Sequence, residues 1–183
     1  MPTDDNNIDK FIDQFNGGNR THRYEIEMEF PTGVSSAQND AMNKFFIRAV
    51  SLPPSQVNPI RIPYRGRILK WPGDRIYFPW TFRVLDQNKG QNKSLWNSFN
   101  EWSNILNDHK TNIASQDWDS FTKDWVIKQV DNRGDDIKKT KLVGCWPTIV
   151  GPISMDANSI DTLVEFTVTV EYAYHLVDGI NSF

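Results

Sequence analysis

Residues Leu163–Tyr174 read Leu-Val-Glu-Phe-Thr-Val-Thr-Val-Glu-Tyr-Ala-Tyr, and apolar and polar side chains alternate along most of this stretch. Such alternation is typical of a β-strand that turns one face to a core and the other to solvent. The segment predicts a single strand of roughly 40 Å, at about 3.4 Å per residue, which exceeds an ordinary strand. The residues expected on its apolar face are Val164, Phe166, Val168, Val170, Tyr172 and Tyr174.

A second alternating segment lies at Tyr24–Phe30, where three glutamates separate the apolar residues, and it also predicts a half-buried strand. Runs rich in aromatic and β-branched residues predict further strands. They occupy residues 45–50, 76–85 (with Pro79 near its start), 125–130 and 139–145, the last two around a polar turn at 132–136. Trp146-Pro147 and Gly151-Pro152 are then expected to break the chain, because proline cannot donate to a strand ladder.

One helix is predicted at Asn92–Leu106, where large apolar side chains recur at the helical period, and residues 107–123 are expected to form a loop. One helix against six to eight strands predicts a mainly β fold, an antiparallel β-sandwich or barrel with one packed α-helix. The chain has 183 residues, with no internal repeat and no linker that would divide it. We therefore expect a single domain over residues 1–183.

Residues 52–75 predict a protruding hairpin arm. Its extended pieces, 59–63 and 67–70, flank the turn Tyr64-Arg65-Gly66, and Pro72-Gly73 is expected to end the second piece. The arm is basic and carries aromatic residues, so a nucleic-acid surface is one interpretation, but docking on an acidic patch of a neighbouring subunit is favoured. The polar N-terminal segment 1–22 and the tail 177–183 flank the remaining chain. The predicted inter-subunit residues of the arm are Arg61, Tyr64, Arg65, Arg67, Trp71 and Arg75.

Charge is nearly balanced, with 20 Lys and Arg against 23 Asp and Glu, which disfavours a surface for phosphates or anionic membranes. No apolar run approaches the roughly 20 residues of a membrane span, and the N-terminus lacks the pattern of a signal peptide. We therefore expect a soluble protein that is made in the cytoplasm. Cys145 is the only cysteine, which excludes an internal disulfide, and it is expected to be a small buried residue.

The search for reactive chemistry finds no motif for nucleotide binding, for a hydrolase nucleophile or for metal ligation. The three histidines, His22, His109 and His175, are far apart in sequence. We therefore predict no catalytic residue, no cofactor and no metal, and a protein that is not an enzyme. A β-barrel module whose exposed tryptophans stack on sugars or bases is a rival prediction.

Two blocks of motifs occur in a distinctive order. The first block contains Leu52-Pro53-Pro54, Pro59-Ile60-Arg61-Ile62-Pro63-Tyr64-Arg65-Gly66, Trp71-Pro72-Gly73-Asp74-Arg75, the strand Trp80–Asp86 and the helix with Trp102. The second block is Gly144-Cys145-Trp146-Pro147-Thr148-Ile149-Val150-Gly151-Pro152-Ile153, which leads into Thr162–Tyr174. Together they resemble the tail tube proteins of contractile-tailed, myovirus-type bacteriophages, over roughly Arg23–Tyr174.

The resemblance implies a tail tube or Hcp-like fold whose copies form hexameric rings. Stacked rings would make a tube that conducts DNA inside a contractile sheath, in a virion assembled in the bacterial cytoplasm. Sheath, baseplate or tube-initiator, and tail-terminator proteins are the implied partners, with no membrane. The alternatives are a tube protein of a type VI secretion system or phage-like bacteriocin, or a related tube initiator or terminator.

A channel that passes DNA must not hold it, and carboxylates repel phosphates. We therefore expect one polar strand face to line the channel, either that of Glu25, Glu27 and Glu29 or that of Glu165 and Glu171.

Overall fold

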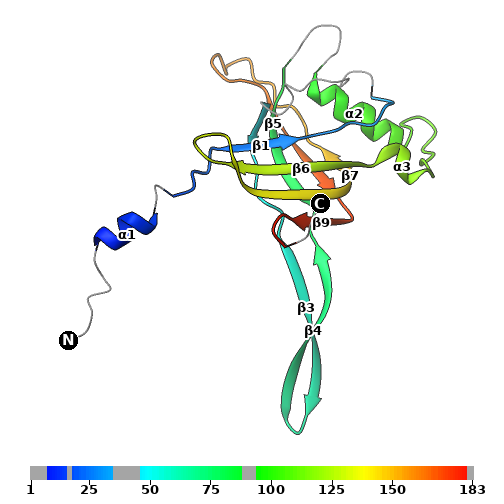
Figure 1. The fold of residues 1–183 in the computed structure, drawn as a ribbon. Helices are drawn as coiled ribbons and strands as arrows, with labels where there is room; N and C mark the ends of the chain where they lie inside the picture. The colour runs from blue at the N-terminus through cyan, green and yellow to red at the C-terminus, as the bar shows by residue number, and fades with distance from the viewer. Residues whose placement is uncertain (1–7, 16–17, 35–45, 88–93, 181–183) are drawn as a thin grey trace.

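The computed structural model describes residues 8–15, 18–34, 46–87 and 94–180 (Figure 1). Its helices are α1 (Ile8–Phe15), α2 (Leu95–Leu106) and α3 (Trp118–Phe121). Its strands are β1 (Tyr24–Glu27), β2 (Ile47–Ala49), β3 (Ser55–Tyr64), β4 (Arg67–Tyr77), β5 (Trp80–Leu85), β6 (Lys123–Val130), β7 (Asp136–Val150), β8 (Glu165–Glu171) and β9 (Tyr174–Val177). Among these described helices, none has the length and apolar character needed to cross a bilayer.

One antiparallel sheet forms the body of the protein, with strand order β1-β6-β7-β8-β5-β2 and with β9 added beside β7. The sheet curls into a half-barrel, and its two end strands approach each other closely. The Tyr24 hydroxyl on β1 donates a hydrogen bond of 2.7 Å to the carbonyl of Ile47 on β2. The predicted mainly β, antiparallel fold is confirmed, and it takes the form of a single curled sheet with α2 packed on it (Figure 1).

Helix α2 begins at Leu95 because the Ser94 hydroxyl accepts a hydrogen bond of 3.2 Å from the Asn97 N–H at the free helix end. Leu95, Phe99 and Trp102 on its inner face are buried, as the predicted apolar stripe requires. The predicted start at Asn92 lies outside the described residues.

Three buried tryptophans hold neighbouring segments against the core, because each indole N–H donates a hydrogen bond to a backbone carbonyl. Trp80 donates to Ser51, Trp102 to Phe121 and Trp125 to Glu29, at 2.6, 2.7 and 2.8 Å. Trp125 also makes ring contacts with Trp80, Phe82, Phe99 and Trp102, at centroid distances of 6.2, 5.8, 6.3 and 5.7 Å. Five large rings therefore form one cluster in the core of the body.

The long C-terminal strand predicted at Leu163–Tyr174 is wrong in its length. The chain changes partners after Glu171: β8 pairs with β5 and with the far end of β7, whereas β9 pairs with Thr140–Val143 of β7. The predicted alternation holds from Phe166 to Tyr172, which are buried at every second position. Val164 and Tyr174 are exposed, because they lie beyond the part of the predicted strand that packs on the core.

The predicted break at Trp146-Pro147 does not occur, and β7 continues to Val150. The ladder with β8 shifts register between Pro147 and Ile149. Here the Thr148 hydroxyl donates to the Thr169 carbonyl at 3.0 Å, so a side chain bonds a backbone acceptor at this irregular point.

The strand predicted at 76–85 is divided, because Ile76 and Tyr77 complete β4 and β5 begins at Trp80. Pro79 lies between the two strands, and β5 is an internal strand between β2 and β8 rather than an edge. The strand predicted at 24–30 ends at Glu27, and that at 45–50 is β2, with Phe45 outside the described residues. The short helix α3 lies in the segment expected to form a loop, and α1 lies in the polar N-terminal segment.

Trp125→Ala should lower the free energy of unfolding by about 3–5 kcal/mol, because it empties the centre of the aromatic cluster. Trp71→Ala is the matched control: Trp71 is 59% exposed on the arm, so its removal should change stability by less than about 0.5 kcal/mol. Denaturant unfolding of dilute protein measures both values, and equal losses would contradict this description of the core.

Candidate assembly surfaces

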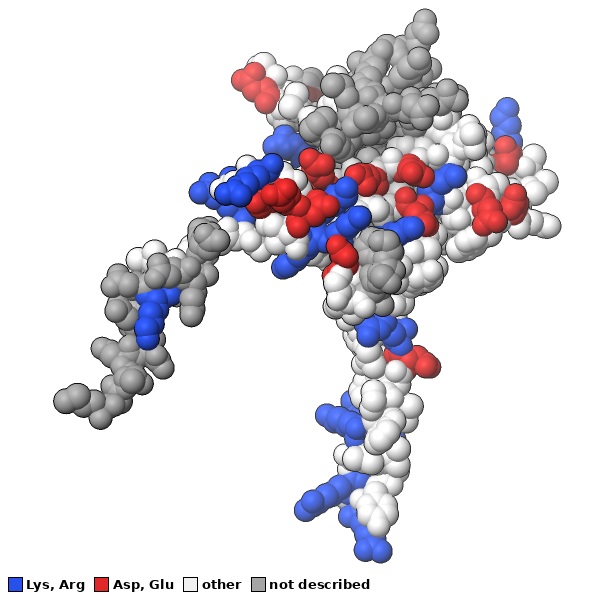
Figure 2. Space-filling view, viewed as in Figure 1, with Lys and Arg blue, Asp and Glu red and all other residues white. Residues whose placement is uncertain are grey.

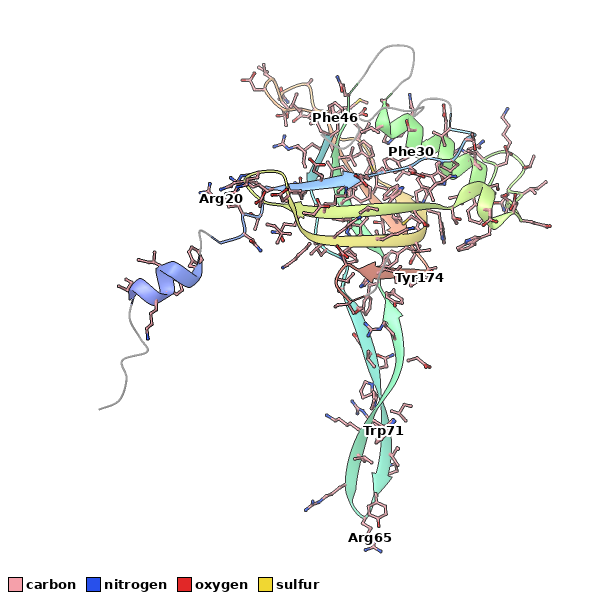
Figure 3. The ribbon with its side chains drawn as sticks, viewed as in Figure 1. Arg20, Phe30, Phe46, Arg65, Trp71 and Tyr174 are labelled. Atoms are coloured by element: carbon pink, nitrogen blue, oxygen red, sulfur yellow. The ribbon has the colours of Figure 1, made fainter. Side chains whose placement is uncertain are left out.

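Strands β3 and β4 form a separate two-stranded ribbon, the arm, which we define as residues 55–77. It projects away from the body, with Trp71 partway along it and Arg65 at its tip (Figure 3). At about 3.3 Å per residue, strands of 10 and 11 residues reach roughly 35 Å. An isolated ribbon of two strands is at best marginally stable in water, so the arm is a candidate for contact with another molecule.

The hairpin turn of the arm is built from Arg65 and Gly66, whose φ angles are 45° and 77°. Two positive φ values give the tight turn whose twist matches that of paired strands. Nearer the body, the register shifts between Val57 and Pro59, opposite Gly73. A Cβ on Gly73 would lie 2.7 Å from the Asn58 carbonyl oxygen, so this position accommodates the irregular ladder only as glycine. Pro72-Gly73 therefore lies within β4, although the sequence predicted that it would end the strand.

The two faces of the arm differ in chemistry. Directly opposed residues share a face, and the pairs Ile60↔Trp71, Ile62↔Leu69 and Tyr64↔Arg67 define one of them. Its apolar side chains are 44–64% exposed. The other face carries Arg61, Lys70, Pro63 and Ile68. We call the first the apolar arm face and define it by Ile60, Ile62, Tyr64, Leu69 and Trp71.

The six arm residues predicted from sequence are all exposed, but they do not form one patch. Tyr64 and Trp71 belong to the apolar arm face, Arg61 lies on the opposite face, and the Arg65 guanidinium stacks over Tyr64 at 5.4 Å. Arg75 lies near the root of the arm and donates to the Ser55 hydroxyl at 2.9 Å. Sequence reasoning missed Ile60, Ile62 and Leu69, although their alternation with polar residues and prolines was the available signal.

Aromatic contacts join the root of the arm to the body. The Tyr77 ring at the end of β4 lies 6.0 Å from the Tyr172 ring and 5.0 Å from the His175 ring. Burial, and then the Arg75 cation, lowers the pKa of His175, so the imidazole is neutral at pH 7. Beside it lies a cavity of about 450 Å³ lined by both apolar and charged residues, including Leu52, Lys138 and Val177. No group of side chains suited to bind a metal occurs in the described part of the chain.

The glutamates predicted to face a channel lie on two different strands, and the sheet order separates β1 from β8 by two strands. Glu27 on β1 forms an ion pair with Lys128 at 2.6 Å. Glu165 on β8 lies 3.3 Å from the Arg48 guanidinium and 3.8 Å from that of Arg83. Glu29 lies beyond the end of β1, and Glu25 and Glu171 lie within their strands.

The outer face of β1, β6 and β7 carries charges of both signs, whereas the arm is mostly basic (Figure 2). On this outer face, Asp124 pairs with Lys141 at 2.9 Å and accepts the Gly144 N–H at 3.0 Å. Burial raises the pKa of Asp124, but these two bonds outweigh it, and the pKa lies below its ordinary value. Charge on this face is thus largely compensated within the subunit.

Three comparisons bear on these surfaces. Residues 19–178 match the profile of the family described as phage tail tube protein. The chain belongs to the phage tail tube protein family. The tail tube protein of Serratia phage KSP90 is 28% identical over 158 residues, which is 85% of this chain and 86% of that protein. The tail tube protein of Enterobacteria phage T4 is 24% identical over 131 residues, which is 71% of this chain and 78% of that protein. The predicted resemblance is confirmed.

The fold of this tail tube protein also recurs in solved contractile injection systems. A chain of the anti-feeding prophage baseplate superposes with a TM-score of 0.61 at 11% identity, covering 89% of this chain and 97% of that one. A chain from the sheath/tube terminator of an extracellular contractile injection system, PVC, gives 0.60 at 16% identity, covering 87% and 96%. These likenesses support the fold. Helix α1 lies outside the residues matched to the tail tube family.

The contacts of Asp124 predict that the stability of the folded protein depends on pH. A carboxylate with a lowered pKa stabilises the folded state above about pH 4, its ordinary titration range, and this contribution is lost as the pH falls through the lower folded value. Asp124→Asn should therefore lower stability by up to about 1 kcal/mol at pH 7, and the difference from wild type should shrink below about pH 4. Asp74→Asn, at an exposed position on the arm, removes the same formal charge and should change stability at pH 7 by less than about 0.5 kcal/mol. A pH-independent deficit for Asp124→Asn would contradict the assignment.

Proposed function

We propose that this tail tube protein is the repeating subunit of the inner tube of a contractile-tailed phage. The proposed tube consists of stacked hexameric rings inside a sheath, is assembled in the bacterial cytoplasm and conducts DNA during ejection. Baseplate or initiator and terminator proteins would meet its ends. Membership of the tail tube family supports this role, and the proposed protein has a structural function with no catalytic step and no cofactor.

The observation that carries the proposal is the arm. The arm exposes an apolar face to solvent, and a two-stranded ribbon is too thin to bury that face itself. The favourable free energy of burying it can therefore be gained only by contact with another molecule. A surface repeated on every copy and complementary to a different site on the next copy builds rings when the rotation closes and filaments when it does not. The arm of each subunit is therefore proposed to contact a neighbouring subunit.

Sheet edges provide a second proposed contact. Strands β1, β2 and β9 each pair with only one other strand among the described residues. Unpaired backbone donors and acceptors at such edges can pair with a strand of another chain. Side-by-side copies could thereby continue the curled sheet of one subunit into the next around a ring.

The outer face of β5 and β8 is the better candidate for the channel wall. Threonine hydroxyls occupy it between the charged residues, with Thr81 and Thr169 linked at 3.0 Å. The two arginines there, Arg48 and Arg83, lie 3.3 and 3.8 Å from the Glu165 carboxylate. On the face of β1, β6 and β7, Lys128 pairs with Glu27 and Lys141 with Asp124, so charge is paired there as well and the threonine hydroxyls are what distinguish the face of β5 and β8. Of the two glutamate sets, we therefore propose that Glu165 and Glu171 face the channel.

Removing the arm tests assembly. Val57 and Arg75 are cross-strand partners, so replacing residues 58–74 with an Asn-Gly turn leaves a short closed hairpin. The variant should keep the unfolding midpoint of the body and remain monomeric, while the wild-type chain forms rings or tubes visible by negative-stain microscopy. Tubes formed by the variant would overturn the role of the arm.

An electron cryomicroscopy map of the tube tests the channel wall. We expect Glu165 and Glu171 to point into the channel, with Lys128 and Lys141 away from it. A channel wall lined mainly by lysine and arginine side chains would refute the proposed orientation.

A further inference from the structure

Helix α1 is amphipathic, and its apolar side is exposed to solvent. Ile8, Phe11, Ile12 and Phe15 follow the helical spacing, so they share one face, and they are 69, 62, 59 and 55% exposed. The Phe11 and Phe15 rings stack at 5.3 Å. Helices shorter than about 12–15 residues are marginal in water, and α1 has 8. Its stability therefore depends on packing against another surface.

The apolar arm face has matching dimensions. Eight helical residues span about 12 Å at 1.5 Å each, and the stretch from Ile60 to Tyr64 spans about 13 Å at 3.3 Å each. Both surfaces expose aliphatic and aromatic side chains. One helix laid on one ribbon would cover the apolar side of each.

Charge also favours this pairing. Residues 1–18 contain four aspartates and one lysine, whereas the arm contains five lysines or arginines and one aspartate. The corresponding formal charges are −3 and +4. Opposite net charge steers encounter and disfavours pairing of two helices α1 or of two arms.

Within one chain, α1 and the arm extend from the body as two separate projections (Figure 1). We propose that the apolar face of α1 packs on the apolar arm face of a second copy of this chain. The inference rests on the proposed assembly. It identifies α1 as the segment of the neighbouring copy that the arm contacts. Helix α1 lies outside the residues matched to the tail tube family, so the proposed contact involves a segment beyond the matched residues.

Cross-linking between two variants that each carry one introduced cysteine tests the contact. Ile12→Cys protein is mixed with Ile62→Cys protein under conditions in which the wild type assembles, and the mixture is oxidised. The native Cys145 can remain, because it is fully buried and burial raises the pKa of its thiol. The expected product is a covalent heterodimer joined through residues 12 and 62, identified by mass spectrometry. Ile113→Cys, which is more exposed than Ile62 (69% against 44%) but lies on the body, replaces Ile62→Cys in the control and should give no comparable product.

A second pair of variants checks the chemistry of the contact. Phe11→Ala in the Ile12→Cys chain should reduce heterodimer formation roughly tenfold, because a buried aromatic ring is lost. Asn19→Ala in the same chain, which alters an exposed uncharged residue outside α1, should leave the yield unchanged.

The outcomes separate this inference from the tube proposal. Normal tubes without the heterodimer, or a link only when both cysteines lie in one chain, overturn the α1 contact and leave the tube proposal intact. A heterodimer from the two cysteine variants, together with a wild-type chain that never forms rings or tubes, supports the contact and overturns the tube proposal.

Discussion

The arm faces a physical constraint that shapes the whole subunit: a two-stranded ribbon has too little thickness to bury its own side chains. Its apolar face therefore stays in solvent until a neighbour covers it. The body, by contrast, buries its own aromatic core: Trp80, Trp102 and Trp125 are buried, and each indole N–H donates to a backbone carbonyl. Folding is thus completed within one chain, whereas burial of the arm requires another.

The root of the arm links these two regions. Tyr77 ends β4 and packs against Tyr172 and His175, which belong to the C-terminal part of the sheet. The arm is therefore anchored to the body by ring contacts at its root. This arrangement suits a subunit that must hold a fixed position in a long polymer, in agreement with its membership of the tail tube family.

Sequence patterns predicted the elements whose burial follows from local spacing. The alternation at Phe166–Tyr172 and the stripe of Leu95, Phe99 and Trp102 both mark buried faces in the structure. The failures have tertiary causes. Strand β7 continues past Pro147 because it pairs with β8, and β8 ends where the chain switches to β9, so neither is visible in local spacing. Of the candidate site, the basic and aromatic arm residues were predicted. The apolar arm face was not predicted, because its aliphatic residues alternate with polar residues and prolines.

Hydrogen exchange of residues 55–77, measured at low and high protein concentration, tests the central claim most directly. In dilute protein the arm amides should exchange quickly while those of β8 stay protected. On assembly, protection should rise along the arm and stay constant in β8. Arm amides that are equally protected in monomers and assemblies, or that remain unprotected within assembled tubes, would contradict the claim that a neighbouring copy covers this ribbon.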